Sequence, residues 1–195
     1  LKDWRRHDQE VSFVVDTSCP RFGSGEAKGT LHQSLRGNDE HRLKEGDEIM
    51  QAFDVSNSDE LVFFTDKAQV YRAKVADFEP VKASMLGDFI PAKLGMDVGE
   101  KPVFMNVQNT YPTGDNMVFI FENGKVARVA SESYRTKSNR KKLTGAYSDK
   151  SPLVKILSLA EDTQLAVYST DSRCAILSTA QLLPKTTRNT QGVTV

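Results

Sequence analysis

The stretch NMVFIFENGKVARV, residues 116–129, decides the fold class. Two runs rich in apolar and β-branched residues flank the pair Asn123-Gly124, which is the strongest short-range signal for a β-hairpin. Similar stretches recur in the chain: ELVFFTDKAQVYRAKVADF begins at Glu60, and QLAVYSTDSRCAILSTAQLL begins at Gln164. A hairpin that recurs along a chain predicts a repeat architecture.

The repeat has a period near 50 residues. A weaker copy, EVSFVVDTSCPRF, begins at Glu10, where Pro20 interrupts the second strand. The four copies start 50, 56 and 48 residues apart, and a second series of β-prone runs occupies 47–55, 101–107 and 151–159. Gly, Pro, Ser and Thr interrupt every candidate helix. We therefore predict an all-β, propeller-like fold of four-stranded blades, either about four or part of a larger disc. The expected blades are residues 10–58, 59–114, 115–162 and 163–195.

Composition indicates a soluble globular chain. Of its 195 residues, 38% are hydrophobic and 27% charged, and no apolar run is long enough to span a bilayer. The two cysteines, Cys19 and Cys174, have no metal or redox spacing, so a cytoplasmic location is expected. The chain lacks an initiator Met and ends in the strand-like run NTQGVTV, which predicts a piece of a longer protein.

Charge is unevenly distributed although the net charge is zero. Residues 1–119 carry 14 Lys and Arg against 20 Asp and Glu, whereas residues 120–195 carry 12 against 6. Such asymmetry is a sign of a polyanion partner for the basic half, although scattered surface charge gives the same count.

Two basic segments concentrate these cations. RTKSNRKKLTGAYSDK (135–150) and PKTTRNTQG (184–192) place them among Ser, Thr, Asn and Gly, a composition suited to a mobile loop that contacts phosphates. A solvated loop without a partner is the alternative. The residues expected to bind DNA are Arg135, Lys137, Arg140, Lys141, Lys142, Lys150, Lys185 and Arg188. The strand cations Arg72, Lys74, Lys125 and Arg128 could face the same surface or only solvent.

No enzyme motif is present. The three histidines have no metal-ligand spacing, there is no Gly-x-x-x-x-Gly-Lys phosphate loop, and adjacent acidic pairs such as Asp47-Glu48 point to opposite faces of a strand. We therefore expect no catalytic residue, no metal site and no cofactor in this chain.

Several longer segments resemble the C-terminal domain of type IIA topoisomerase A subunits, that is, of DNA gyrase or topoisomerase IV. They are ELVFFTDKAQVYRAKVADF, LGDFIPAKLGMDVGEK, FIFENGKVARV, TKSNRKKLTGAYSDKSPLV and PKTTRNTQGVTV, and the resemblance extends from about residue 33 to 195. It implies a β-pinwheel, a propeller-like disc whose blades exchange strands, with double-stranded DNA wrapped around its basic rim. It further implies that the DNA strands are cleaved by another part of the same polypeptide. The parent complex would be a heterotetramer with the topoisomerase B subunit that uses ATP and Mg²⁺.

The resemblance is incomplete in two places. Residues 1–30 match poorly, and the Gln-Arg-Arg-Gly-Gly-Lys-Gly box of gyrase A subunits is missing, which favours a topoisomerase IV-like protein. A second function class stays open: a β-propeller scaffold for protein interactions that binds no nucleic acid. The acidic first half and the zero net charge favour this alternative, because DNA-wrapping domains are usually basic.

Overall fold

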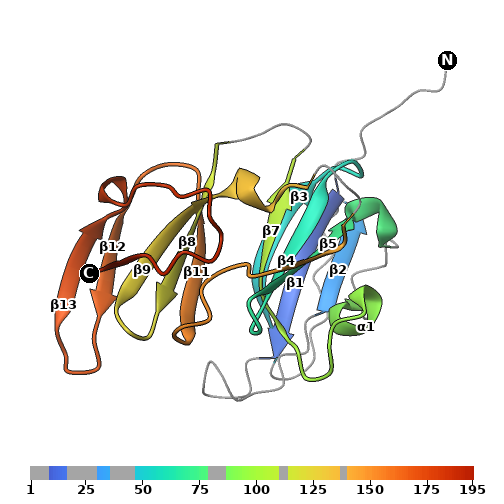
Figure 1. Ribbon diagram of the computed structural model, residues 1–195. Helices are drawn as coiled ribbons and strands as arrows, with labels where there is room; N and C mark the ends of the chain where they lie inside the picture. Colours follow the sequence, from blue (N-terminus) through green and yellow to red (C-terminus); the bar gives the residue numbers. More distant parts are fainter. Residues whose placement is uncertain (1–8, 17–29, 36–46, 79–86, 110–113, 137–139) are drawn as a thin grey trace. The chain divides into compact units, whose positions relative to one another are not determined.

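The computed structural model describes residues 9–16, 30–35, 47–78, 87–109, 114–136 and 140–195. These residues form strands joined by turns, short 3-10 elements and a five-residue helix, α1 (Ile90–Leu94) (Figure 1). Within them no helix has the length and apolar character that a bilayer crossing requires. The expected all-β fold is confirmed, whereas the exact bounds of the blades stay a prediction. The chain divides into two compact units, residues 1–111 and 112–195.

The first unit contains antiparallel sheets built from neighbouring hairpins. One sheet has the order β3-β1-β2-β6, with bounds Asp47–Val55, Gln9–Asp16, Thr30–Leu35 and Asp88–Phe89. In the next sheet, β4 (Glu60–Thr65) pairs with β5 (Gln69–Lys74) on one side and with β7 (Pro102–Gln108) on the other. Strand β6 follows the β4–β5 hairpin in the chain but pairs with β2. The segment after one hairpin therefore supplies the last strand of the preceding sheet.

The core of the first unit comes from the alternating side chains of these strands. Leu61 and Phe63 of β4 lie in one cluster with Tyr71 of β5 and Met105 of β7, and all four are almost fully buried. Helix α1 adds Ile90 to the same cluster and ends at Gly95, whose positive φ of 61° is typical of a left-handed helix cap. This short helix covers part of the sheet and forms no helical layer.

The second unit repeats this plan. Its larger sheet has the order β11-β8-β9-β14, with bounds Leu153–Leu159, Asn116–Phe121, Lys125–Ala130 and Val193–Thr194. A separate hairpin pairs β12 (Gln164–Tyr168) with β13 (Cys174–Ser178). Strand β14, which follows that hairpin, pairs with β9 of the larger sheet, as Val193 faces Val126. The unit also contains the short strand β10 (Lys142–Thr144).

The three predicted hairpins share detailed backbone geometry. The ninth residue of each hairpin lies in its turn and adopts the left-handed conformation: Ala68 has a φ of 52°, Gly124 of 73° and Ser172 of 64°. Each second strand then leads into a 3-10 element, η1 (Val75–Asp77), η2 (Ser131–Tyr134) or η3 (Thr179–Gln181). The first residue of each element donates its N–H to the carbonyl just before the hairpin, at Asp59, Asp115 and Thr163. The repeat inferred from the sequence is therefore a repeat of hydrogen bonds as well.

The copy at Glu10 differs from the others in its second strand. β1 pairs with β2, which begins at Thr30, and the stretch after Pro20 lies outside the described residues. The second series of β-prone runs is confirmed as β3, β7 and β11. Each joins the hairpin that precedes it, since β3 pairs with β1, β7 with β4 and β11 with β8.

Packing in the second unit uses both faces of its larger sheet. On one face Val118 and Val126 pack with Leu177 of the β12–β13 hairpin and with Leu182. On the opposite face Phe119 stacks on Tyr147, with ring centroids 5.5 Å apart. Because successive side chains of a strand point to opposite faces, β8 supplies both clusters and is buried along most of its length.

Glycine at position 172 is expected to stabilise the third hairpin. Ser172 is exposed and adopts a φ of 64°, a conformation that costs a residue with a Cβ about 1–2 kcal/mol, whereas glycine adopts it freely. Part of this gain is offset by the greater flexibility of glycine in the unfolded chain. We expect S172G to raise the free energy of unfolding by about 0.5–1 kcal/mol in urea titrations.

The reverse change at the equivalent turn serves as the control. G124S should lower the free energy of unfolding by about 1 kcal/mol, because Gly124 has a φ of 73° in the same position. Equal stability of S172G and the parent protein would contradict the shared turn geometry.

Candidate nucleic-acid interface

A hollow in the second unit brings together the two basic segments. Its volume is about 490 Å³, and η2, the end of β10 and the segment before β14 line it with Ser133, Thr144, Gly145, Thr186, Thr187, Arg188 and Asn189. We call it the Arg188 hollow. Among the described residues that line it, none carries a carboxylate, and most offer a hydroxyl or amide group. This composition suits an anion more than a cation.

Among the sequence-predicted residues that the structure describes, Arg188 alone lines this hollow. The side chain is half-buried, and its Nη1 donates a hydrogen bond to the carbonyl oxygen of Ser133 at 3.3 Å. Burial raises the pKa of the neighbouring Tyr134 phenol far above its usual value, and the positive charge of Arg188 offsets part of that rise. Tyr134 thus stays neutral and donates its hydroxyl to the carbonyl oxygen of Ala146 at 2.7 Å.

The segment that carries Arg188 is held at both ends by β9. Near its start Lys185 donates its N–H to the Arg128 carbonyl at 2.9 Å and accepts from Ala130 at 3.0 Å. At its end β14 pairs with the first residues of β9. Gly192 lies so close to β9 that a Cβ there would be 2.2 Å from the Val126 carbonyl oxygen. The residues between these anchors, Thr186 to Gln191, therefore form an arc that is held at both ends.

The other basic segment approaches the arc at Gly145. A Cβ placed on Gly145 would lie 4.0 Å from Cβ of Asn189, so the two backbones are neighbours. Upstream of this contact, Arg140, Lys141 and Lys142 are exposed, whereas Leu143 is buried. The buried leucine fixes the segment while the three cations stay in solvent. The two basic segments thus meet at one site.

The remaining predicted cations have other surroundings. Arg135 forms an ion pair with Glu132, with 2.9 Å between Nε and Oε1, so part of its charge is neutralised. Lys150 and Lys185 have exposed side chains that do not line the hollow. Lys137 lies outside the described residues. In the preceding copy, Lys93 pairs with Asp88 at 3.3 Å, so part of its charge is neutralised as well.

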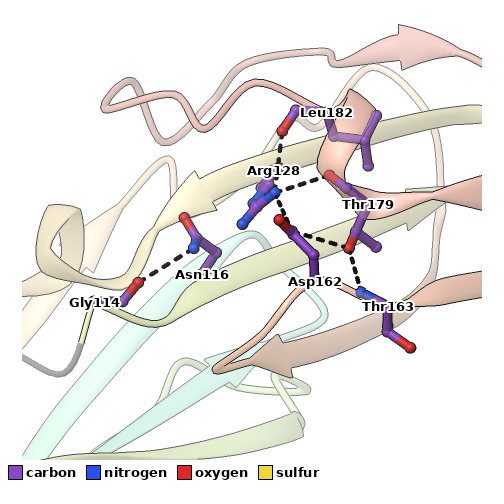
Figure 2. Close-up of polar contacts among 7 residues, drawn as sticks. All are labelled: Gly114, Asn116, Arg128, Asp162, Thr163, Thr179 and Leu182. Carbon is purple, nitrogen blue, oxygen red and sulfur yellow. Dashed lines mark hydrogen bonds and ion pairs between the residues drawn. The ribbon is translucent and has the colours of Figure 1, made fainter.

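Two of the strand cations are largely buried and form ion pairs. Arg72 is buried and pairs with Glu60. Arg128, at the equivalent position of the next hairpin, donates from Nη1 to Asp162 at 2.7 Å and to the Thr179 carbonyl at 2.8 Å. Figure 2 shows this guanidinium directed at Asp162, Thr179 and Leu182. Lys74 and Lys125 differ from them, because the first side chain is exposed and the second only half-buried.

Sequence reasoning missed the neutral part of the site. Thr144, Thr186, Thr187 and Asn189 were expected only as small polar residues between the cations of a mobile loop, and Ser133 lies outside both basic segments. The signal that could have found them is the dense run of hydroxyl and amide side chains beside Arg188. The described residues contain no group of three His, Cys, Asp or Glu side chains that could hold a metal ion.

Comparisons with known proteins agree on the fold. The sequence model of the family described as DNA gyrase C-terminal domain, beta-propeller, matches residues 59–84. The C-terminal domain of DNA topoisomerase IV superposes with a TM-score of 0.78 and 16% identity, over 98% of this chain and 57% of that one. The C-terminal domain of E. coli ParC superposes with a TM-score of 0.67 and 11% sequence identity, over 96% of this chain and 72% of that one. The C-terminal domain of DNA gyrase A superposes with a TM-score of 0.57 and 15% sequence identity, over 97% of this chain and 62% of that one.

The resemblance inferred from sequence is therefore confirmed. The chain has the β-pinwheel fold found in the C-terminal domains of type IIA topoisomerase A subunits, and its 59–84 segment matches their family model. It spans 57% of the length of the topoisomerase IV domain. None of the curated protein sequences compared with the chain matches it.

Proposed function

We propose that this chain is a non-catalytic, DNA-binding domain of the A subunit of a type IIA DNA topoisomerase. It holds a duplex segment against the basic loops of its second unit and presents it to the catalytic core for strand passage. Strand cleavage, ATP and Mg²⁺ belong to other parts of the complex, which includes the topoisomerase B subunit. The observation that carries the proposal is the meeting of two basic segments at a hollow whose described lining residues carry no carboxylate.

The charge of the second unit supports this proposal. Residues 112–195 carry 12 Lys and Arg against 7 Asp and Glu. Three of those acidic residues form ion pairs with arginines: Arg128–Asp162, Arg135–Glu132 and Arg173–Asp171. Seven lysines, Arg140 and Arg188 remain in this unit against four other acids, which leaves an excess of positive charge. Such a surface attracts a polyanion and releases the counterions condensed on it.

The position of the cations indicates how the DNA is read. In the described part of the second unit most of them lie on loops and strand ends, with Arg128 and Lys155 inside β9 and β11, and no α-helix is placed there to enter a groove. Contacts from such loops go mainly to phosphates, which position a duplex without reading its sequence. We therefore expect binding that depends on backbone geometry and bending more than on base sequence.

Removal of the three exposed cations tests the function. The variant with Arg140, Lys141 and Lys142 all changed to Ala should bind a long duplex more weakly, to about the same degree for every DNA sequence. The slope of log K against log salt should become shallower by about 1 for each phosphate that is no longer neutralised. The fold should survive, because exposed side chains of this kind change stability by about 0.5 kcal/mol or less. Gel shifts at several salt concentrations measure both quantities.

A matched variant in the acidic first unit controls for net charge. Lys67, Lys74 and Lys93 are exposed, and changing all three to Ala removes the same charge. This control should keep the parent salt slope. Equal losses in both variants would indicate long-range attraction without a local site. No duplex binding by the parent protein at low salt would overturn the proposal and favour the interaction scaffold.

A further inference from the structure

We propose that the Arg188 hollow is a binding site for a phosphate oxyanion and that it takes one phosphodiester group of the bound duplex. This inference rests on the proposed function and assigns Arg188 a role different from that of the other cations. The exposed cations attract DNA from a distance, whereas Arg188 fixes one phosphate at a defined place.

The chemistry of the lining fits this ligand. Arg188 supplies a guanidinium whose fork of N–H donors matches two oxygens of a phosphate. The hydroxyl groups of Thr144, Thr186 and Thr187 and the amide of Asn189 lie around the same space. The four are exposed, so their donors are accessible from solvent. With no carboxylate among these lining residues, an entering anion meets no repulsion from the wall.

The guanidinium is oriented before any ligand arrives. One Nη1 hydrogen bond ties it to the Ser133 carbonyl, and the side chain is partly shielded from solvent. An oriented side chain loses less conformational entropy on binding than an exposed lysine does. Arg188 should therefore contribute more per charge than Arg140 or Lys141, whose side chains are exposed.

The walls of the hollow are fixed as well. The arc from Thr186 to Gln191 is anchored by Lys185 on one side and by β14 on the other. The opposite wall is held by the hydrogen bond from Tyr134 to the Ala146 carbonyl. A volume of about 490 Å³ exceeds the need of a bare phosphate and leaves space for an adjoining sugar. This size favours a diester within a chain over a free inorganic ion.

The first experiment uses a small probe in place of DNA. Backbone amides of the whole chain are followed by NMR while diethyl phosphate, a simple phosphodiester, is added; a second titration uses inorganic phosphate. Saturable shifts at Gly145 and Asn189 that disappear in R188K and R188Q support the site. Shifts spread over unrelated loops, shifts that persist in both variants, or the absence of shifts would overturn it. Shifts with inorganic phosphate alone would overturn the assignment to a DNA phosphodiester.

The second experiment measures duplex DNA binding by the same variants. R188K keeps the charge but loses the fork, so the salt slope should stay at the parent value while affinity falls about tenfold. R188Q should also make the slope shallower by about 1. T187V, which removes one hydroxyl and no charge, should weaken binding with an unchanged slope. R173A is the matched control, since Arg173 is exposed outside the hollow and should leave the affinity within about twofold.

The two proposals fail in distinguishable ways. Parent-like affinity of R188K and R188Q, together with a loss in the Arg140, Lys141 and Lys142 variant, would overturn the phosphate site and leave DNA binding intact. Failure of the parent protein to bind any duplex would overturn the proposed function. It would also overturn the assignment to DNA, whatever the diethyl phosphate titration shows.

Discussion

Changing Gly192 to alanine is expected to lower the free energy of unfolding by about 3 kcal/mol, one of the two largest effects that we predict. A Cβ at this position would lie 2.2 Å from the carbonyl oxygen of Val126 and 2.7 Å from the amide nitrogen of Ala127. These atoms belong to the central strand β9 and cannot move without breaking its pairing with β8. The φ of 77° adds a further cost for any residue other than glycine.

The consequence extends from stability to binding. If Gly192 is forced away from β9, β14 loses its pairing and the arc that carries Arg188 loses one of its two anchors. We therefore expect faster amide exchange at Val193 and Thr194 and weaker duplex binding under conditions where the rest of the chain is folded. Urea unfolding gives the change in stability, and hydrogen exchange locates it.

Gly114 provides the matched control for backbone strain. It has the same φ of 77°, but no atom of the described residues lies within 4 Å of a Cβ placed there. G114A should cost only about 1 kcal/mol, the strain of the left-handed conformation. If G192A costs no more than G114A, the close approach of Gly192 to β9 is wrong.

Changing Arg128 to alanine is the second large effect expected. Its side chain is 10% exposed and bonds to Asp162, to the Thr179 carbonyl and to the Leu182 carbonyl at 3.4 Å. Asp162 also accepts from the Thr179 hydroxyl, which in turn accepts the Thr163 N–H (Figure 2). Removal of Arg128 takes this donor from the carbonyls of the buried Thr179 and Leu182 and the ion-pair partner from Asp162, so we expect a loss of about 2–4 kcal/mol in the free energy of unfolding.

The structural role of Arg128 separates it from the DNA-binding cations. It joins β9 to the turn after the β12–β13 hairpin, next to the apolar contact of Val118 with Leu177 and Leu182. K125A removes the same charge from the same strand at a half-buried side chain and should change stability by about 0.5 kcal/mol or less. Under conditions where R128A is folded, its salt slope for DNA should equal that of the parent protein. A shallower slope would show that Arg128 contacts phosphate after all.

Much of the fold was predictable because it is local. The hairpins at residues 60, 116 and 164 depend on short runs of apolar and β-branched residues and on short turns, which act over fewer than about ten positions. Their recurrence, together with the second series of runs, predicted an all-β repeat and not a single sheet. Partner choice between strands was not predictable. That β14 pairs with β9, and β6 with β2, depends on closure over long stretches of chain, for which periodicity carries no signal.

The candidate site was predictable only in part. The sequence identified Arg140, Lys141, Lys142, Lys185 and Arg188 as loop cations, because their neighbours are small and polar. For Arg128 it left two alternatives, the DNA-binding surface or solvent, whereas the structure places this residue in an ion pair with Asp162. The sequence around an isolated arginine in a strand does not indicate which carboxylate it pairs with, and here that carboxylate is 34 residues further along the chain. Such pairs form only when hairpins pack against each other.

By itself, the sequence determined the hairpin unit, its period near 50 residues and the accumulation of positive charge after residue 119. Tertiary structure alone decided which cations remain available and which stabilise the packing between strands. It also decided that Arg188, Thr144 and Asn189 share one hollow, although they come from segments about 45 residues apart. The physical reason is that strand and turn preferences act between close neighbours, whereas a binding site needs groups that only strand exchange and side-chain packing bring together.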